Sequence, residues 1–362
     1  MTQDEPPPPA RKSRPTMREV AALAGVAIKT VSRVVNGVST VDPAIATRVR
    51  EAADQLGYRP NLTASSLRRG DGRTATIGML VEDAANPFSA ALTRTVENVA
   101  RERGVLVLIG SLDEDPVRER ELASALIDRR VDGLIIVPAG RDHSYLMREQ
   151  RAGTCLVFLD REPSLLEADA VISDNRQGAI NAVSHLLDAG HRRIAYIGDR
   201  ETIPTAAQRL AGYRHALEVA HIEYDAEIVR QEGGTLETVL ETTEQVLSLP
   251  DPPTALFTSQ NLVTIGASRA LRTLGLHESV AHVGFDDFPM ADMLRPGISV
   301  IAQEIETMGR TAAEILFRRL DGDRTPAHTV TVPTRLIARG SGEIRPAGPG
   351  VPDKGRTVSD RT

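Results

Sequence analysis

Polar side chains that could bind a polyhydroxylated molecule follow the ends of several short apolar runs. Asparagine and phenylalanine follow TIGMLV, an Asp–Arg pair follows TCLVFL, a Gln–Asn pair follows TALFTS, and an aspartate follows VAHVGF. Each carboxylate can accept hydrogen bonds from two hydroxyls, each guanidinium can donate to their oxygens, and a phenyl ring can cover an apolar ring face. This pattern indicates a site for a sugar-like ligand, formed by Asn86, Phe88, Asp160, Arg161, Gln260, Asn261, Asp286 and Gln303.

The elements that must position these side chains lie between residues 74 and 340. Apolar runs there alternate with amphipathic helical stretches, which predicts parallel sheets with right-handed crossovers. The runs fall into two groups, about 74–172 and 173–300, so we expect two doubly wound subdomains with a cleft between them. Ligands of open α/β sheets bind at the carboxyl ends of strands, and the polar residues should therefore meet in that cleft.

Residues 16–60 are typical of three short helices without strands. Thr16 and Glu19 form a capping box that starts the first helix, and Gly25 suits the left-handed turn that ends it. An Asp42-Pro43 pair starts the third helix. The expected helices cover about 17–25, 28–36 and 43–56, and the first two have the spacing of a helix-turn-helix.

The second of these helices has two different faces. Helical periodicity places three valines on one face and the polar side chains of Lys29, Ser32, Arg33 and Asn36 on the other. The polar face could enter a major groove of DNA, where arginine or lysine donates to guanine and asparagine pairs with adenine. Periodicity alone fits a purely structural helical hairpin equally well.

The distribution of charged residues also separates the helical N-terminal part of the chain from the remainder. Residues 1–70 carry 11 Lys and Arg against 6 Asp and Glu, a balance of +5, whereas the remainder has a balance of −11. A small basic head on a larger acidic body suggests that the head binds a polyanion. A composition of 41% hydrophobic and 25% charged residues excludes a disordered or fibrous chain.

The N-terminal segment closely resembles the DNA-binding head of the lac repressor (LacI/GalR) family of bacterial transcription regulators. The chain departs from the family pattern at Glu19 and at Ala27, which lacks the side-chain cap of the second helix at a cost of about 1 kcal/mol. The resemblance rests on Val20-Ala21, Ala24-Gly25-Val26, Thr30-Val31-Ser32-Arg33-Val34, Asn36, Gly57-Tyr58-Arg59-Pro60-Asn61 and Ser66-Leu67-Arg68.

This resemblance implies how the head contacts DNA. Ile28, Lys29 and Arg33 occupy the positions at which the family reads bases, and residues 61–70 correspond to a hinge helix. That helix orders on operator DNA beside its twin in a homodimer, and Leu67 would insert into the minor groove as a wedge. A flexible linker with an incidental leucine is the alternative. Further implied DNA contacts are Thr16, Thr30, Ser32, Asn36, Asn61 and Ser65.

The body resembles the regulatory domain of the same family and the periplasmic ribose-binding proteins. The implied fold is an all-α helix-turn-helix headpiece plus an α/β periplasmic-binding-protein-like body, with Arg209 as a further cleft residue. The implied subdomains are about 74–172 plus 301–324, and about 173–300 plus 325–340. The implied function is a homodimeric repressor of operator DNA controlled by a pentose or hexose; a sugar phosphate, a purine and the opposite sign of control stay open.

Signals for other functions are missing from the sequence. It has no glycine fingerprint for dinucleotides, no Walker-type loop, no nucleophile elbow and no metal-ligand spacing among its eight histidines, so no cofactor, metal or catalytic residue is expected. A sugar-transport module and a doubly wound sugar-modifying enzyme are the alternative functions. Without a signal peptide or a membrane-spanning run, we expect a cytoplasmic protein that has no membrane partner, with disordered tails at 1–15 and 341–362.

Overall fold

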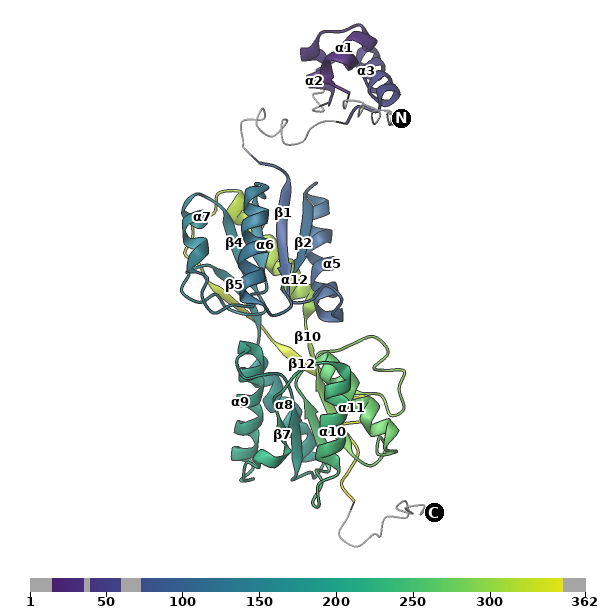
Figure 1. Ribbon diagram of the computed structural model, residues 1–362, viewed down its shortest axis with the longest axis vertical. Helices are drawn as coiled ribbons and strands as arrows, with labels where there is room; N and C mark the ends of the chain where they lie inside the picture. The colour runs from purple at the N-terminus through teal and green to yellow at the C-terminus, as the bar shows by residue number, and fades with distance from the viewer. Residues whose placement is uncertain (1–14, 36–39, 60–72, 348–362) are drawn as a thin grey trace, which may run out of the picture. The chain divides into compact units, whose positions relative to one another are not determined.

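The computed structural model describes residues 15–35, 40–59 and 73–347 (Figure 1). The chain forms two compact units that divide at Thr74 and Ala75. In the described part of the chain, no helix combines the length and apolar character needed to cross a bilayer.

The first unit contains three helices, α1 (Met17–Ala24), α2 (Ile28–Val35) and α3 (Pro43–Leu56). The three start and stop signals read from the sequence are confirmed. Thr16 and Glu19 form the capping box of α1, Gly25 ends it at a φ of 63°, and Asp42 accepts from the first amides of α3. The helices enclose a small core around the fully buried valines Val20, Val31 and Val49.

The second unit contains two six-stranded sheets, one in each subdomain. The first has the order β11-β5-β4-β3-β1-β2 and is entirely parallel. Its strands are β1 (Thr76–Val81), β2 (Leu106–Ser111), β3 (Gly133–Ile136), β4 (Cys155–Leu159), β5 (Asp169–Ser173) and β11 (Thr329–Val332).

The second sheet has the order β12-β10-β9-β8-β6-β7 and is parallel except for the antiparallel pair β10–β12. Its strands are β6 (Ile194–Ile197), β7 (Val229–Arg230), β8 (Ala255–Thr258), β9 (Ala281–Phe285), β10 (Ser299–Gln303) and β12 (Thr334–Ile337). Both subdomains are therefore doubly wound, as the alternation of strands and helices predicts.

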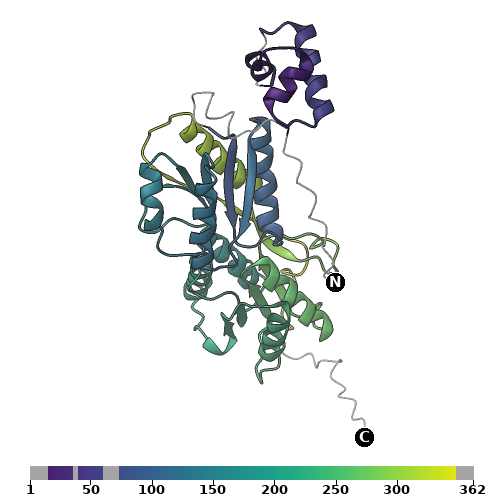
Figure 2. The same ribbon diagram turned by 45° about the horizontal axis from the view of Figure 1, so that its top comes forward.

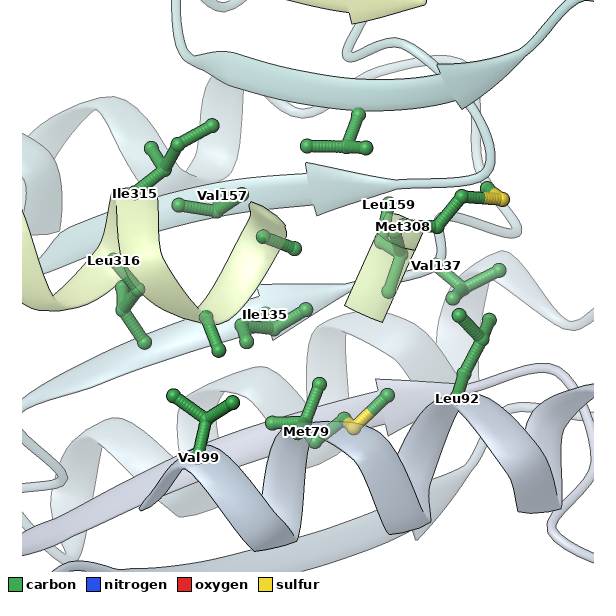
Figure 3. Packing of buried hydrophobic residues seen from close by; sticks show 14 of the residues in the cluster. Met79, Leu92, Val99, Ile135, Val137, Val157, Leu159, Met308, Ile315 and Leu316 are labelled. Carbon is green, nitrogen blue, oxygen red and sulfur yellow. The ribbon is translucent and has the colours of Figure 1, made fainter. Parts of the chain in front are cut away.

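Helices cover both faces of each sheet (Figures 1 and 2). In the first subdomain, α5 (Pro87–Glu102) and α12 (Ile305–Leu320) pack on one face, and α6 (Pro116–Asp128) packs on the other; the short helix α7 (Met147–Arg151) has no fully buried residue. Figure 3 shows how Leu92 and Val99 of α5 and Ile315 and Leu316 of α12 meet the sheet residues Met79, Ile135 and Val157. In the second subdomain, the two pairs of covering helices are α8 (Asn175–Asp188) with α9 (Pro204–Val219), and α10 (Leu236–Leu247) with α11 (Asn261–Thr273).

The chain passes between the subdomains three times: from β5 to α8, from β10 to α12, and from β11 to β12. Two expected boundaries are corrected by these crossings. Residues 301–303 belong to the second sheet, because β10 pairs with β9. Residues 329–332 belong to the first sheet, because β11 pairs with β5, and the chain crosses only afterwards at Pro333.

The prediction of a disordered tail at 341–362 is also wrong for the first residues of this range. Ser341 is 2% exposed and donates to the carbonyl of His282, Glu343 accepts from Ser299, and the carbonyl of Ile344 bonds the ring of His191. The body thus extends through this packed segment, which forms hydrogen bonds with the first residues of β9 and β10. Residues 1–14 and 348–362 lie outside the described part of the chain.

Candidate functional site

The exposed face of α2 presents three of the side chains that the sequence and its resemblance predict to contact DNA. Val31 is fully buried, whereas Ile28, Lys29 and Arg33 are exposed. Arg33 Nη2 donates to Thr40 Oγ1 at 2.7 Å, so its guanidinium is held at the surface. The predicted division is confirmed for Val31 on one side and for Lys29 and Arg33 on the other, and the exposed face is cationic with one apolar residue, Ile28.

The other implied DNA contacts differ in exposure, and the structure describes only three of them. Thr16 is exposed, but its hydroxyl is used in the capping box with Glu19, and Thr30 and Ser32 are partly buried. The remaining four fall outside the described residues: Asn36, Asn61, Ser65 and Leu67.

Ala27 leaves α2 without a side-chain cap. The carbonyl of Ala27 accepts from the amides of Thr30 and Val31, but its methyl group cannot accept from the first-turn amides. Ala27→Ser should therefore stabilise α2 by about 1 kcal/mol. Hydrogen exchange of the α2 amides should slow about fivefold, and unchanged exchange would show that this helix end needs no cap.

The nine expected ligand-binding side chains line one cavity of about 550 Å³ between the two subdomains of the body. Both sheets direct the carboxyl ends of their strands toward it. The prediction that these strand-end residues lie together in one cleft is therefore confirmed. The first subdomain contributes Asn86, Phe88, Asp160 and Arg161, and the second contributes Arg209, Gln260, Asn261, Asp286 and Gln303.

Two of the acids occupy equivalent places in the two sheets. Asp160 follows β4 and Asp286 follows β9, and both have left-handed backbones, with φ values of 68° and 69°. Each amide donates to a carbonyl of the neighbouring strand, Val171 and Ile301 respectively, at 2.8 Å. Aspartate is one of the few residues that tolerates this conformation, which turns both carboxylates into the cleft.

Arg209 is fixed from several sides. Its Nε donates to Asn175 Oδ1 at 2.8 Å, and its Nη1 donates to the Ser259 carbonyl at 2.6 Å and lies 3.4 Å from Asp286 Oδ2. The guanidinium also stacks on the Phe285 ring, 3.8 Å from its centroid. This arginine is therefore preorganised rather than free to move onto an anion.

Arg161 is paired in the same way in the first subdomain. Its guanidinium forms two hydrogen bonds with the carboxylate of Glu114, one of them at 2.8 Å, and a third with the Pro138 carbonyl at 2.9 Å. Its Nε lies 3.5 Å from Asp160 Oδ2. Both buried guanidiniums of the cleft thus have carboxylate partners within the protein.

The carboxamides and Phe88 have structural contacts as well. Asn261 Nδ2 donates across the cleft to Asn86 Oδ1 at 2.8 Å, and Gln260 Oε1 caps α11. Gln303 Nε2 donates to Asp286 Oδ1 at 2.6 Å. Phe88 is 8% exposed and packs in the first core, so that only part of its ring faces the cavity.

Two buried acceptors in the cleft have no hydrogen-bond donor among the described residues. They are Asp160 Oδ1 and Gln303 Oε1, and both belong to side chains less than 10% exposed. Leaving a buried acceptor unpaired is costly. A ligand hydroxyl can donate to each, which fits the polyhydroxylated ligand that the residue types predict.

Sequence reasoning missed several acids of this cavity. Glu82 follows β1 and Asp199 follows β6, so the strand-end rule that found Asp160 could have found them too. Burial, and next the charge of Glu114, raise the pKa of Glu82 to about 7. Burial also raises the pKa of Asp199 and of Asp160. No group of three His, Cys, Asp or Glu in the described segments could hold a metal ion.

Comparison with known proteins supports both units. Residues 16–61 match the model of bacterial regulatory proteins of the lacI family, and residues 183–342 match a periplasmic binding protein-like domain. The HTH-type transcriptional regulator PtxS of Pseudomonas aeruginosa is 36% identical over 340 residues, 91% of this chain and 96% of PtxS.

Two solved structures extend the comparison. The complex of the regulator CelR with cellobiose is 33% identical, has a TM-score of 0.67, and matches 91% of this chain and 100% of that one. The lac repressor dimer bound to operator and the anti-inducer ONPF is 26% identical, has a TM-score of 0.79, and matches 91% of this chain and 99% of that one.

A helix-turn-helix unit joined to a two-subdomain body with a polar cleft defines a ligand-responsive transcription regulator. The chain belongs to the lacI family of bacterial regulatory proteins. It is a DNA-binding transcriptional regulator and not an enzyme, and this excludes both alternative functions that its doubly wound body left open.

Proposed function

We propose that this regulator is a homodimeric repressor in which α2 reads operator DNA. Ile28, Lys29 and Arg33 would contact bases from the exposed face of α2, and Thr30 and Ser32 would position the helix on phosphates. The dimer of the lac repressor on its operator supports two heads on a pseudo-palindromic site. A protein with this role works beside the chromosome, in the cytoplasm.

We further propose that a free pentose or hexose bound in the cleft controls operator affinity. The observation that carries this proposal is the convergence on one cavity of the nine side chains predicted to bind a polyol, with Asp160 Oδ1 and Gln303 Oε1 still lacking donors. The cellobiose in the CelR complex supports a sugar in the same kind of cleft.

Control requires two states that the ligand distinguishes. Subdomain closure joins Asn261 to Asn86 and Arg141 Nη2 to the Thr202 carbonyl at 2.7 Å, and both bonds cross from one subdomain to the other. A sugar that contacts Asp160 on one side and Asp286 on the other stabilises this closed arrangement. In the dimer, closure would reorient the N-terminal subdomains, separate the hinge segments and release the operator.

A dye-based thermal-shift screen tests the effector, since the chain has no tryptophan for intrinsic fluorescence. The probes are pentoses, hexoses, disaccharides, sugar phosphates and purines. A ligand at about 100 times its dissociation constant adds about 2.7 kcal/mol of stability. Hits are then titrated into the protein bound to a labelled operator. A stabilising sugar that leaves operator affinity unchanged would contradict the proposed control.

The wedge role of Leu67 has a separate test. Leu67→Ala should lower operator affinity about tenfold or more, because alanine is too short to hold open the unstacked base step. Affinity for the effector and for non-specific DNA should not change. Operator titrations by fluorescence anisotropy measure this, and equal operator affinity of variant and parent would remove the wedge.

A further inference from the structure

Helix α9 begins at the effector cavity without a side-chain cap. Its N-cap residue is Ile203, whose side chain cannot accept a hydrogen bond, and the helix runs for 16 residues. Ile203 and Thr205 both line the cavity. Two other helices line the cavity with their first turns, and both are capped by a side chain of their own, α5 by Asn86 and α11 by Gln260. Of these three helices, only α9 presents an uncapped first turn to the cavity.

Two amides of this first turn have no acceptor within the described part of the chain. Pro204 has no N–H group, and Ala207 already donates to the Ile203 carbonyl at 3.0 Å. The amides of Thr205 and Ala206 are left without a partner. Side chains, water or ligands satisfy such amides, and the positive end of the helix dipole favours an oxygen that carries negative partial charge.

The Thr205 side chain is a second and independent sign of a ligand. It is 7% exposed, lines the cavity, and forms no hydrogen bond with any residue that the structure describes. Thr205 lies four residues before Arg209, on the same side of α9, and Arg209 also lines the cavity. A buried hydroxyl without a partner is costly, so we expect the effector to supply one.

A further unpaired donor comes from the other subdomain. Arg161 is 6% exposed, and its Nε lies 3.5 Å from Asp160 Oδ2 without a hydrogen bond to any described residue. The cavity therefore offers free donors as well as the free acceptors Asp160 Oδ1 and Gln303 Oε1. A ligand that only donates, such as a polyamine, would leave the donors unpaired. A sugar satisfies both kinds of group, because its hydroxyls donate and accept and its ring oxygen accepts.

We propose that the uncapped first turn of α9 binds an oxygen atom of the effector and that Thr205 is a further specificity-determining residue of the cleft. The amides of Thr205 and Ala206 and the Thr205 hydroxyl hold this oxygen in the place that a capping side chain takes in other helices. This inference rests on the proposed sugar effector and adds a contact region to it. The same turn takes part in closure, because the Thr202 carbonyl accepts from Arg141 of the other subdomain.

Two substitutions of Ile203 test the free amides. Ile203→Ser adds a hydroxyl that can cap α9, whereas Ile203→Ala removes the same apolar side chain without adding a cap. The serine variant should melt about 2 °C higher than the alanine variant. It should bind the effector about fivefold more weakly than the alanine variant, because the effector must displace the new cap from the amides. A helix end with a purely structural role would change the melting temperature and not the affinity.

Substitutions of Thr205 test its hydroxyl. Thr205→Val removes the hydroxyl, keeps the shape of the side chain, and should weaken effector binding about threefold or more. Thr205→Ser keeps the hydroxyl and should bind like the parent. Thr242→Val is the matched control, because Thr242 is a threonine of α10 in the same subdomain that is 6% exposed and does not line the cavity. The control should keep the parent affinity.

Isothermal titration of the full-length protein measures these affinities. The probes are ribose, glucose and cellobiose, together with ribonate and gluconate, in which a carboxylate replaces the aldehyde carbon. A neutral sugar as the tightest probe assigns a hydroxyl or ring oxygen to α9, and an acid as the tightest probe assigns a carboxylate. In both cases the tightest probe should show the difference between Ile203→Ser and Ile203→Ala.

The outcomes separate this inference from the function on which it rests. Equal affinities of the two Ile203 variants would overturn binding at the α9 amides, and equal affinities of Thr205→Val and the parent would overturn the role of Thr205. Both results leave control by a sugar standing. A panel without any binding would contradict the sugar effector itself, and this inference with it.

Discussion

Replacing Asp286 by asparagine should abolish the response to the effector and leave operator binding intact. Asp286 accepts from Gln303 Nε2 at 2.6 Å, lies 3.4 Å from Arg209 Nη1, and lines the cleft. The asparagine cannot accept from sugar hydroxyls through a charged oxygen, and it leaves Arg209 with a weaker partner. Hydrogen bonds to charged groups contribute about 1.5–3 kcal/mol each, and losing two of them lowers effector affinity about 100-fold or more.

Asparagine is a better replacement than alanine because of the backbone. The φ of Asp286 is 69°, and asparagine tolerates this left-handed conformation, whereas alanine adds strain of about 1 kcal/mol. Asp287→Asn is the matched control, because Asp287 is bonded to Arg339 at 2.7 Å and does not line the cavity. Effector titrations against the operator complex measure both variants. A wild-type response of the Asp286 variant would show that another group holds the sugar.

The sequence was most informative where local chemistry decides the structure. Helices α1 and α3 begin at the expected residues, and α1 ends at its expected residue, because Thr16, Gly25 and Asp42 act on the backbone next to them. Buried strands such as β3 and β4 are continuous apolar runs, which are typical of parallel sheets covered on both faces. Edge strands carry a weaker signal: β11 alternates exposed and buried residues, and β7 has only two residues.

Pairing between distant segments could not be predicted in this way. Nothing local in Thr329–Val332 states that it pairs with β5 rather than with the second sheet, and this is why the expected boundary was wrong there. The same holds for Ser341 and Ile344, whose partners lie about 60 and 150 residues away. The cleft residues were predictable because the carboxyl ends of parallel strands converge wherever the strands lie in the sheet.

Glu119 shows what such reasoning misses. It lies on the amphipathic helix α6, where an acid is expected to face water, yet it is 1% exposed. Its Oε2 accepts from the amides of Ala139 and Gly140 at 2.7 and 3.0 Å, and its Oε1 accepts from the Tyr145 hydroxyl at 2.8 Å. The partners are loop groups about 20 residues away, so no spacing within α6 reveals this role.

Glu119→Ala should lower the free energy of unfolding by about 3–5 kcal/mol, because three donors lose their acceptor and each unpaired buried group costs about 1–3 kcal/mol. Glu121→Ala, on the same helix but exposed, should change it by less than about 0.5 kcal/mol. Urea unfolding followed by circular dichroism measures both. Equal stability of the Glu119 variant and the parent would mean that water replaces the carboxylate at these amides.

Glu119→Ala should also weaken binding at the effector site. Glu119 holds the loop after β3, and this loop supplies the Pro138 carbonyl to Arg161 and carries Arg141, which bonds the Thr202 carbonyl across the cleft. Once the loop loosens, the closed arrangement loses one of its inter-subdomain bonds and Arg161 loses a support. Effector affinity should therefore fall in Glu119→Ala at temperatures at which the variant is fully folded. An unchanged affinity would show that Arg161 is positioned by Glu114 alone.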